Sequence, residues 1–326
     1  MGRRHPRLRR TPRRRPRPAR PRHGRARPRP FGGALSTHQA DHGPGLYAIS
    51  DLHAGFDGNL DAIDRLRPRT DGDWLVVAGD VADRFGTIVD TLDRLRDRFA
   101  RVVWTPGNHD LWTPPGDPVQ ARGAERYGAL VDALRRHDVT TPDDDWPVWT
   151  SGAGPVTIVP LHLLFDYSFR DTTGLSRREA VAEARRSGVM SSDEVYLHPD
   201  PFESRDAWSR ALVDAARRRL DALPDGVRTV LVNHYPLERG PLARIRRAQI
   251  GMWAGTTATA GWAVRYRAEA VVYGHLHIPV TDVIEGVPHH EVSLGYPRER
   301  GHEWSRPRRA LRLLEPGGAD IVVTPS

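Results

Sequence analysis

The sequence of 326 residues predicts an α/β protein. Short apolar runs of strand length alternate along the chain with longer segments whose apolar residues recur at helical spacing. The short runs are apolar at nearly every position, as in strands that are buried on both faces of a sheet. Polar residues cluster where several of these runs end. We therefore expect strands joined by helical crossovers in one large domain.

The first half of the chain alternates three strands with three helices. The clearest helical pattern lies in residues 83–99, where apolar side chains recur every three or four positions between Asp and Arg. The expected strands are 46–50, 74–78 and 102–105, and the expected helices are 59–67, 83–99 and 120–136.

The second half adds two further buried strands and a group of closing strands that are partly antiparallel. The closing group contains a hairpin through Glu285 and Gly286. Residues 165–205 and 240–262 are expected to be helical insertions that cover the site. The expected strands are 156–164, 227–232, 270–273, 280–284, 291–294 and 310–314, and the expected helices are 176–187 and 204–223.

Composition excludes several classes of protein. No apolar run approaches the roughly 18 residues of a membrane-spanning helix, and the charged N-terminus lacks the apolar stretch of a signal peptide. We therefore expect a cytoplasmic protein without a membrane partner. The chain has no cysteine, so any metal must bind to His, Asp, Glu or Asn side chains.

The basic charge is confined to the N-terminus. Residues 1–30 hold 14 arginines and no acidic residue, and in the rest of the chain 35 basic residues face 41 acidic ones. We expect residues 1–42 to be a disordered Arg/Pro-rich tail and residues 43–326 to be the folded domain. A role in nucleic-acid binding would depend on this tail alone.

Five polar clusters end apolar runs in the sequence. Because ligands bind at the carboxyl ends of strands in open α/β sheets, we interpret the clusters as one metal site. Carboxylate, imidazole and amide oxygen suit manganese, iron or zinc, and the set is too large for one four-coordinate ion but fits two ions that share a carboxylate. The predicted ligands are Asp51, His53, Asp80, Asn108, His234, His275 and His277.

Two metal ions at such a site favour phosphoester hydrolysis. They would clamp a phosphoryl group and hold a bridging hydroxide for in-line attack. His109 follows the predicted ligand Asn108, where its imidazole can contact the phosphate or protonate the leaving group. Asp110 is the neighbouring carboxylate that we expect to orient His109.

The order of these clusters resembles the calcineurin-like metallophosphoesterases over about residues 46–294. The resemblance implies a four-layer α/β/β/α sandwich with two mixed sheets, in place of a single sheet. It also implies that His109 contacts the phosphate and that Asp80 bridges two metals. By resemblance, the first metal is bound by Asp51, His53, Asp80 and His277, and the second by Asp80, Asn108, His234 and His275.

A closer resemblance is to the actinobacterial phosphopantetheinyl hydrolases. The segments that carry it are 48–53, 74–80, 104–112, 273–279 and Ser293-Leu294-Gly295-Tyr296-Pro297-Arg298-Glu299. This resemblance implies that the protein removes 4′-phosphopantetheine from holo acyl or peptidyl carrier proteins by cleaving a phosphodiester to serine.

Other functions stay open at this stage. A cyclic-nucleotide or general phosphodiesterase and a protein phosphatase would use the same ligands. A non-enzymatic alternative is a metal-bound scaffold or nucleic-acid adaptor that acts through the Arg-rich tail. The sequence makes no prediction about the oligomeric state.

Several residues near the clusters carry weaker hypotheses. Arg298 can hold a substrate phosphate. Asp83 either hydrogen-bonds a metal ligand or caps the following helix. Aromatic residues of the insertions (Phe165, Tyr167, Trp253 and Trp262) either line a substrate cleft or, with greater weight, pack in the core. The histidines outside the clusters (His137, His162, His198, His289, His290 and His302) are assigned to the surface or the core.

Overall fold

The computed structural model describes residues 43–170, 174–301, 308–314 and 319–323. The predicted tail at 1–42 and His302 lie outside this part of the chain. The folded unit described below falls within His42–Ser326. None of the described helices is both long and apolar enough to cross a bilayer.

The first sheet has three parallel strands in its middle and at one edge. Because β1, β2 and β3 pair in parallel, they end on the same side of the sheet. Two antiparallel strands from the end of the chain extend the other edge. In sheet order the strands are β11 (Ile321–Val322), β10 (Arg309–Leu313), β1 (Leu46–Ile49), β2 (Trp74–Val77) and β3 (Arg101–Trp104).

The second sheet is also mixed, with an antiparallel hairpin at each edge and parallel pairs between them. The predicted hairpin turn is confirmed, since Glu285 and Gly286 both have positive φ angles, of 50° and 84°. In sheet order the strands are β4 (Val148–Ser151), β5 (Gly154–Pro160), β6 (Thr229–Val232), β7 (Ala268–Tyr273), β9 (Val287–Glu291) and β8 (Val280–Ile284).

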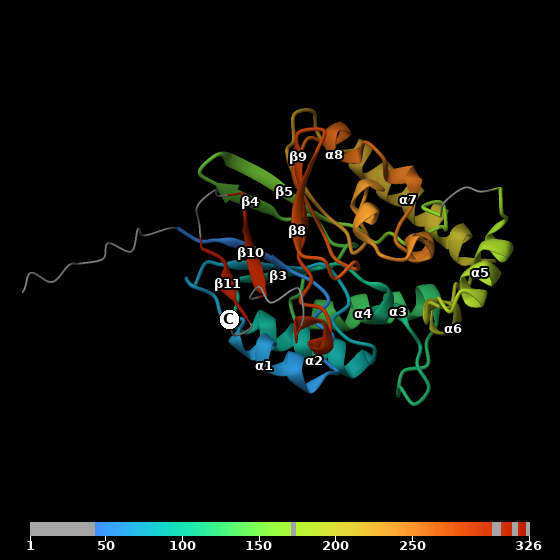
Figure 1. The fold of residues 1–326 in the computed structure, drawn as a ribbon. Coiled ribbons are helices and arrows are strands. Elements are labelled where there is room, and N and C mark those ends of the chain that lie inside the picture. The colour runs from blue at the N-terminus through green and yellow to red at the C-terminus, as the bar shows by residue number, and fades with distance from the viewer. Residues whose placement is uncertain (1–42, 171–173, 302–307, 315–318, 324–326) are drawn as a thin grey trace, which may run out of the picture. The chain divides into compact units, whose positions relative to one another are not determined.

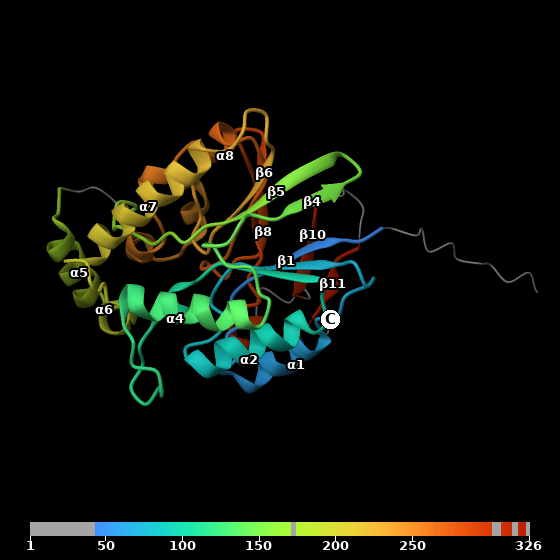
Figure 2. The same cartoon turned by 180° about the vertical axis from the view of Figure 1, so that it is seen from behind.

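The two sheets pack face to face, and the outer face of each is covered by helices (Figures 1 and 2). Alternate residues of each strand explain this arrangement, because both faces need an apolar partner. In β1, Tyr47 and Ile49 join the core beneath the helices, whereas Leu46 and Ala48 join the core between the sheets. The four-layer fold and its α/β class are therefore confirmed.

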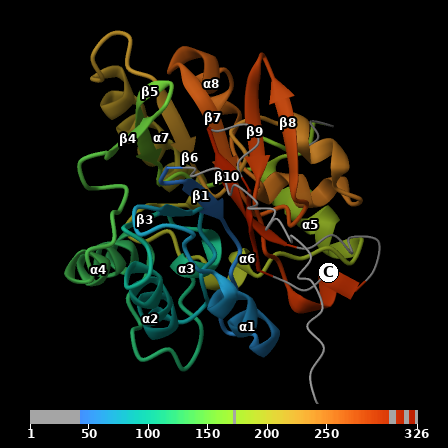
Figure 3. The ribbon, with the colours of Figure 1, turned by 90° about the vertical axis from the view of Figure 1, so that its left-hand side faces the viewer.

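Each sheet is covered by its own set of helices. Three amphipathic helices, α1 (Asp57–Arg65), α2 (Phe85–Arg96) and α4 (Gly123–Arg136), cover the first sheet with side chains such as Ile63, Leu92 and Leu130. On the other side, α7 (Arg205–Asp221) and the short α8 (Trp262–Arg265) cover the second sheet with Val213, Leu220 and Trp262. Figure 3 shows both layers from the side.

Two further segments, which we call the cover segments, consist of the described residues of 165–205 and 240–262. The first contains α5 (Arg177–Arg186) and α6 (Asp193–Tyr196), and the second forms the 3₁₀ turns η1 (Gly240–Arg244), η2 (Ala248–Trp253) and η3 (Thr257–Thr259). The segments contact each other, since Trp253 Nε1 donates to Glu194 Oε1 at 2.8 Å and Thr256 Oγ1 donates to Asp166 Oδ2 at 2.7 Å.

Some predicted boundaries are wrong. The strand expected at 291–294 is β9, which begins at Val287 and contains Pro288, a residue that argues against a strand in the sequence. The strand expected at 156–164 ends at Pro160, and the helix expected at 83–99 begins only at Phe85. The sequence missed several elements of two to five residues, which are too short to show a period: α3 (Asn108–Leu111), β4, α6, η4 (Pro297–Gly301) and β11.

His162 illustrates the cost of a polar group in this core. Its ring lies between Tyr127, at 3.9 Å between centroids, and Trp208, at 5.7 Å. Neither ring nitrogen has a hydrogen-bond partner among the described residues. Burial lowers the pKa of His162 to about 3. The imidazole is therefore neutral in the folded protein at pH values where an exposed histidine is protonated.

We predict that His162→Phe reduces the acid sensitivity of the fold. The pKa of His162 is lower in the folded than in the unfolded state, so its contribution to stability is present above about pH 6.5 and declines as the pH falls toward 3. Between pH 7 and pH 5 the wild type should lose about 2 kcal/mol more than the variant in its free energy of unfolding. Urea titrations at both pH values measure this difference. Equal losses in the two proteins would contradict the prediction.

Candidate dimetal centre

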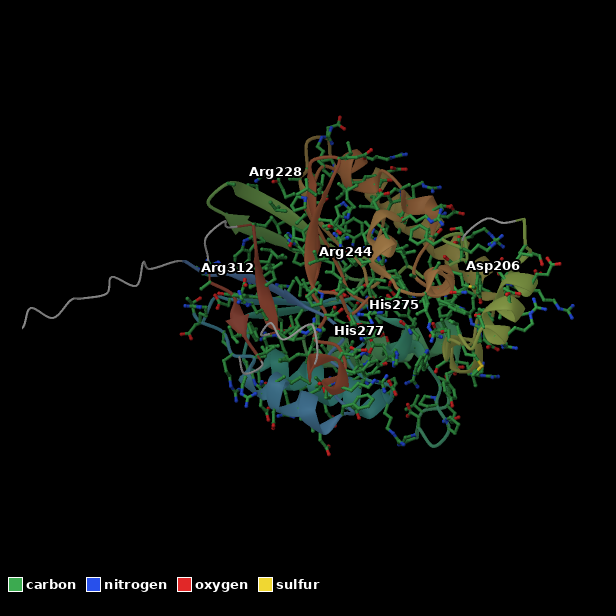
Figure 4. All side chains as sticks on the ribbon, in the orientation of Figure 1. Asp206, Arg228, Arg244, His275, His277 and Arg312 are labelled. Carbon is green, nitrogen blue, oxygen red and sulfur yellow. The ribbon has the colours of Figure 1, made fainter. Side chains whose placement is uncertain are left out.

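The predicted ligands meet where the carboxyl ends of strands from both sheets come together. Asp51, Asp80 and Asn108 follow β1, β2 and β3 of the first sheet. His234 and His275 follow β6 and β7 of the second sheet. Figure 4 places His275 and His277 in the middle of the molecule, between the two halves of the sandwich.

The ligand atoms form two groups. In the first, His277 Nε2 lies 3.0 Å from Asp51 Oδ1 and 3.2 Å from His53 Nε2. In the second, Asn108 Oδ1 lies 3.1 Å from His234 Nε2 and 3.2 Å from His275 Nδ1. Six of the seven predicted ligands are therefore brought together in two groups.

Asp80 lies between the two groups. Its Oδ2 is 3.4 Å from His234 Nε2, and its carboxylate also has ligand atoms of His53 and His109 within 4.8 Å. The backbone N–H of His109 donates to Asp80 Oδ1 at 2.9 Å. Asp80 is thus the carboxylate in position to be shared between two ions.

The arrangement fits a pair of metal ions. Ligands at roughly 2.1 Å from an ion are separated from one another by about 3.0–3.4 Å in octahedral or tetrahedral geometry. The closest ligand atoms within each group are 3.0–3.4 Å apart. Imidazole nitrogens that face each other at 3.2 Å compete for one proton, whereas a cation between them satisfies both lone pairs. The donor set of imidazole, carboxylate and amide oxygen suits manganese, iron or zinc.

Ionisation within the site supports the same interpretation. Burial alone raises the pKa of Asp51, but His277, His234 and His53 outweigh it and lower that pKa well below its usual range. Burial lowers the pKa values of His53 and His275 to about 3. In contrast, Asp80 and Asp51 outweigh burial at His234 and raise its pKa to about 9, and Asp51 and Glu299 outweigh burial at His277 and raise its pKa to about 10. Cations that bind here would take the place of protons on these imidazoles.

Five of the ligands adopt left-handed backbone conformations. The φ angles are 52° at Asp51, 40° at His53, 53° at Asp80, 68° at His275 and 58° at His277. Such conformations cost of order 1–3 kcal/mol each for residues other than glycine. Neighbouring backbone groups hold them: the N–H of His53 donates to the carbonyl of Asp80, and the N–H of Asp51 to that of Gly79, both at 3.0 Å.

Two glycines allow the polypeptide to approach these ligands. A Cβ atom at Gly107 would collide with the Asp80 carboxylate, and one at Gly274 would collide with Asp51 Oδ2 and Ser50 Oγ. The glycine that precedes Asn108, and the one that precedes His275, therefore provide space next to the carboxylates of other strands.

Hydrogen bonds behind the ligands orient them. His277 Nδ1 donates to Glu299 Oε2 at 2.8 Å, and His234 Nδ1 donates to the carbonyl of Ala78 at 2.9 Å, so that Nε2 of each ring faces the centre. The hydroxyls of Ser50 and Ser293 donate to Asp51 Oδ2 at 2.6 and 2.7 Å. The sequence did not identify Glu299 in this role, although it ends the segment Ser293 to Glu299 that carries the closer resemblance.

The surroundings of His109 differ from the expectation. Its Nδ1 donates to Asp83 Oδ1 at 2.7 Å, so Asp83 occupies the position expected of Asp110. The side chain of Asp110 accepts instead from the backbone N–H groups of Val81, at 2.8 Å, and Gly107, at 3.0 Å. Burial, together with nearby Asp80, raises the pKa of Asp110 to about 7. Asp110 thus joins the loops that follow β2 and β3.

Asp83 fits neither of its two hypotheses, because it contacts His109 and not a predicted ligand. The residue in the capping position of α2 is Arg84, and the first N–H of that helix, at Phe85, donates to Asp117 Oδ2 at 2.9 Å. In the sequence, Asp83 stood out only because it follows Asp80 by three residues. That position did not show whether Asp83 contacts a metal ligand, caps the helix or pairs with His109.

Tyr296 brings the C-terminal part of the domain to the site. Its ring stacks on His53 with centroids 4.2 Å apart, and its hydroxyl lies 3.3 Å from His109 Nε2. Arg298 is exposed, and its guanidinium lies over the Tyr296 ring, 4.7 Å from the ring centroid. Arg298 therefore lies at the rim of the site, and its contact with a substrate phosphate stays a prediction.

The remaining candidates lie away from the ligands. Phe165, Trp253 and Trp262 are buried among core residues, as the packing interpretation expects. His289 is buried in β9, whereas His137 pairs with Asp93 at 2.8 Å on the surface. Among the described residues, neither of these histidines belongs to a group that could hold a metal ion.

Comparison with known proteins agrees with this geometry. The model of the calcineurin-like phosphoesterase family matches residues 46–279. The chain is 47% identical to the acyl-carrier-protein phosphodiesterase PptH of Mycobacterium tuberculosis over 291 residues, which cover 86% of this chain and 90% of that protein. It is 28% identical to a symmetrical bis(5′-nucleosyl)-tetraphosphatase of Aromatoleum aromaticum over 56% of this chain and 68% of that protein.

The fold is similar to a solved structure. The crystal structure of phosphopantetheinyl hydrolase (PptH) from Mycobacterium tuberculosis matches with a TM-score of 0.81 and 48% sequence identity. The match covers 85% of this chain and 98% of that one.

We predict that Gly274→Ala weakens metal binding. The added Cβ atom must displace Asp51, so the free energy of unfolding should fall by about 1–3 kcal/mol and the metal content of the purified protein should fall with it. Elemental analysis and urea titration measure the two effects.

Gly128→Ala is the matched control, because a Cβ atom at Gly128 in α4 meets nothing within 4 Å. This variant should keep the wild-type metal content and gain about 0.5–1 kcal/mol. Full metal content in the Gly274 variant would show that the close approach at Asp51 is unimportant.

Proposed function

The chain belongs to the calcineurin-like phosphoesterases, and from this premise we propose that it hydrolyses the phosphodiester linking 4′-phosphopantetheine to a serine of a carrier protein. The observation that carries the substrate is the relative of 47% identity, over most of both chains, whose name is acyl-carrier-protein phosphodiesterase. The ligand geometry supports the reaction class, because the closest ligand atoms within each group are 3.0–3.4 Å apart, as the ligands of one ion would be.

We assign the ligands to two ions that share Asp80. The first ion would be held by Asp51, His53 and His277, and the second by Asn108, His234 and His275. When bound, two such ions would neutralise phosphoryl charge and lower the pKa of a hydrolytic water. Manganese or iron is our first choice and zinc the second, because the chain offers imidazole and carboxylate donors and no thiolate.

His109 is the residue that we assign to proton transfer. The contact between Nδ1 and Asp83 fixes the ring so that Nε2 faces the centre, 3.8 Å from Asp80 Oδ2. Burial lowers the pKa of His109, but the carboxylates Asp80 and Asp83 outweigh burial and raise it. A protonated Nε2 can therefore hydrogen-bond a phosphoryl oxygen or give its proton to the departing serine oxygen.

The wider assignments are also part of the proposal. Residues 43–326 form the catalytic domain, and the cover segments recognise the substrate beside the metal ions. We keep the cytoplasmic location expected from the sequence, and the catalytic role requires no nucleic acid.

We expect the purified protein, supplied with Mn²⁺, to convert a holo carrier protein to its apo form. Mass spectrometry of the carrier measures the loss of 4′-phosphopantetheine directly. Asp80→Asn is the control, because it removes the charge shared by the two metal sites at nearly constant size. If the wild type leaves the carrier intact but cleaves cyclic nucleotides, phosphopeptides or aryl phosphodiesters, the substrate is wrong and the reaction class stands.

A second prediction concerns His109. Loss of general acid catalysis typically costs about 10²–10⁴-fold in rate, and it matters most when the leaving group is a poor one. His109→Gln should therefore slow cleavage of the carrier-protein serine ester far more than cleavage of bis(p-nitrophenyl) phosphate, whose leaving group needs no proton. Steady-state kinetics with both substrates measure this ratio.

Asp83→Asn should also slow cleavage of the carrier-protein ester more than cleavage of bis(p-nitrophenyl) phosphate, but by a smaller factor. The imidazole of His109 is retained in this variant and loses only its charged partner. An equal loss on both substrates would argue that His109 binds the phosphate and does not supply a proton.

A further inference from the structure

The short helix α6 of the first cover segment inserts an acidic side chain behind the predicted metal centre. Asp193, its first residue, is 1% exposed. Its Oδ1 accepts from Asn108 Nδ2 at 2.9 Å and from Trp112 Nε1 at 2.7 Å, and its Oδ2 accepts from Ser191 Oγ at 2.9 Å. A buried carboxylate from the first cover segment thus accepts a hydrogen bond directly from a predicted metal ligand that lies 85 positions away in sequence.

The contact decides which end of the Asn108 amide faces the ions. The oxygen Oδ1 lies 3.1 Å from His234 Nε2 and 3.2 Å from His275 Nδ1. Rotation of the amide by half a turn would replace this oxygen with an NH₂ group, which cannot bind a cation. Asp193 Oδ1 also accepts from Trp112 Nε1, which can only donate, so this oxygen acts as an acceptor, pairs with the NH₂ group of Asn108 and leaves the amide oxygen toward the metal.

The next residue of α6 anchors the helix to its surroundings. Glu194 Oε1 accepts from Tyr167 Oη at 2.9 Å and from Trp253 Nε1 at 2.8 Å, and Glu194 Oε2 pairs with Arg205 at 3.1 Å. Tyr167 belongs to the first cover segment and Trp253 to the second. Glu194 therefore links the two cover segments to each other, whereas Asp193 beside it makes the hydrogen bond to Asn108.

We propose that Asp193 is a positioning residue for the second metal ion, and that the first cover segment forms part of the metal centre through it. The inference rests on the proposed dimetal function, which assigns Asn108 to that ion. Asp193 acts only through Asn108 and touches neither metal nor substrate.

Three variants test the proposal on the full chain. Asp193→Ala removes the acceptor, Asp193→Asn keeps an oxygen that can accept from Asn108, and Glu194→Ala loosens α6 without touching Asn108. Each protein is loaded with Mn²⁺ and titrated by calorimetry, and bound manganese is counted by elemental analysis. Metal binding is measured without substrate, so it is independent of the carrier-protein assay.

We expect Asp193→Ala to bind one Mn²⁺ with wild-type affinity and the other about 10–100-fold more weakly, as is usual when a partner of a metal ligand is lost. Asp193→Asn should restore two ions of near wild-type affinity. Glu194→Ala should lower the unfolding temperature but keep both ions. If Asp193→Ala does not fold, Asp193→Glu shifts the carboxylate by one methylene and should lose the same single ion.

Two outcomes would overturn the proposal. If Asp193→Ala or Asp193→Glu folds and binds both ions as tightly as the wild type, the carboxylate does not position Asn108. If Glu194→Ala loses the same ion to the same extent, the packing of α6 is responsible and the bond to Asn108 is not. A wild type that binds two ions but leaves every carrier protein intact would contradict the proposed substrate and leave the role of Asp193 standing.

Discussion

The central constraint on this protein is the burial of two carboxylates and several imidazoles between the ends of two sheets. Asp51 and Asp80 are almost completely removed from solvent, and so are His53 and His234. Charged groups in such a place are stable only when they are paired, hydrogen-bonded or bound to cations. The strained backbone of the ligands, the glycines beside them and the hydrogen bonds behind them all serve to keep these groups together.

The four-layer fold makes this burial possible. Each sheet contributes parallel strands whose carboxyl ends point to the same side, and the apolar layer between the sheets brings those ends into contact. The outer helices bury the other faces, which leaves the ends of the strands as the place where polar side chains converge. The first cover segment reaches this edge, where Asp193 accepts a hydrogen bond from Asn108.

Much of the site could be predicted from the sequence because its signals are local. A buried strand followed by a polar cluster is visible in a few residues, and the same pattern occurs at Asp51, Asp80, Asn108, His234 and His275. One boundary that the sequence misplaced is the start of the strand predicted at 291–294. The hairpin turn at Glu285 and Gly286 and the pairing with β7 on the other side place β9 at Val287–Glu291, with Pro288 inside it.

The sequence by itself determined the α/β class, the strands that end at the site and the residue types that bind metal, because periodicity and the chemistry of side chains are properties of short segments. Only the tertiary structure decided which carboxylate forms a hydrogen bond with which side chain of the site. Asp83 and not Asp110 contacts His109, Glu299 holds His277, and Asp193 holds Asn108. Some of these pairs join residues that are far apart along the chain, and in others a neighbouring carboxylate was an equally suitable partner in the sequence. Which carboxylate makes each hydrogen bond therefore depends on how the two sheets and the cover segments pack in space.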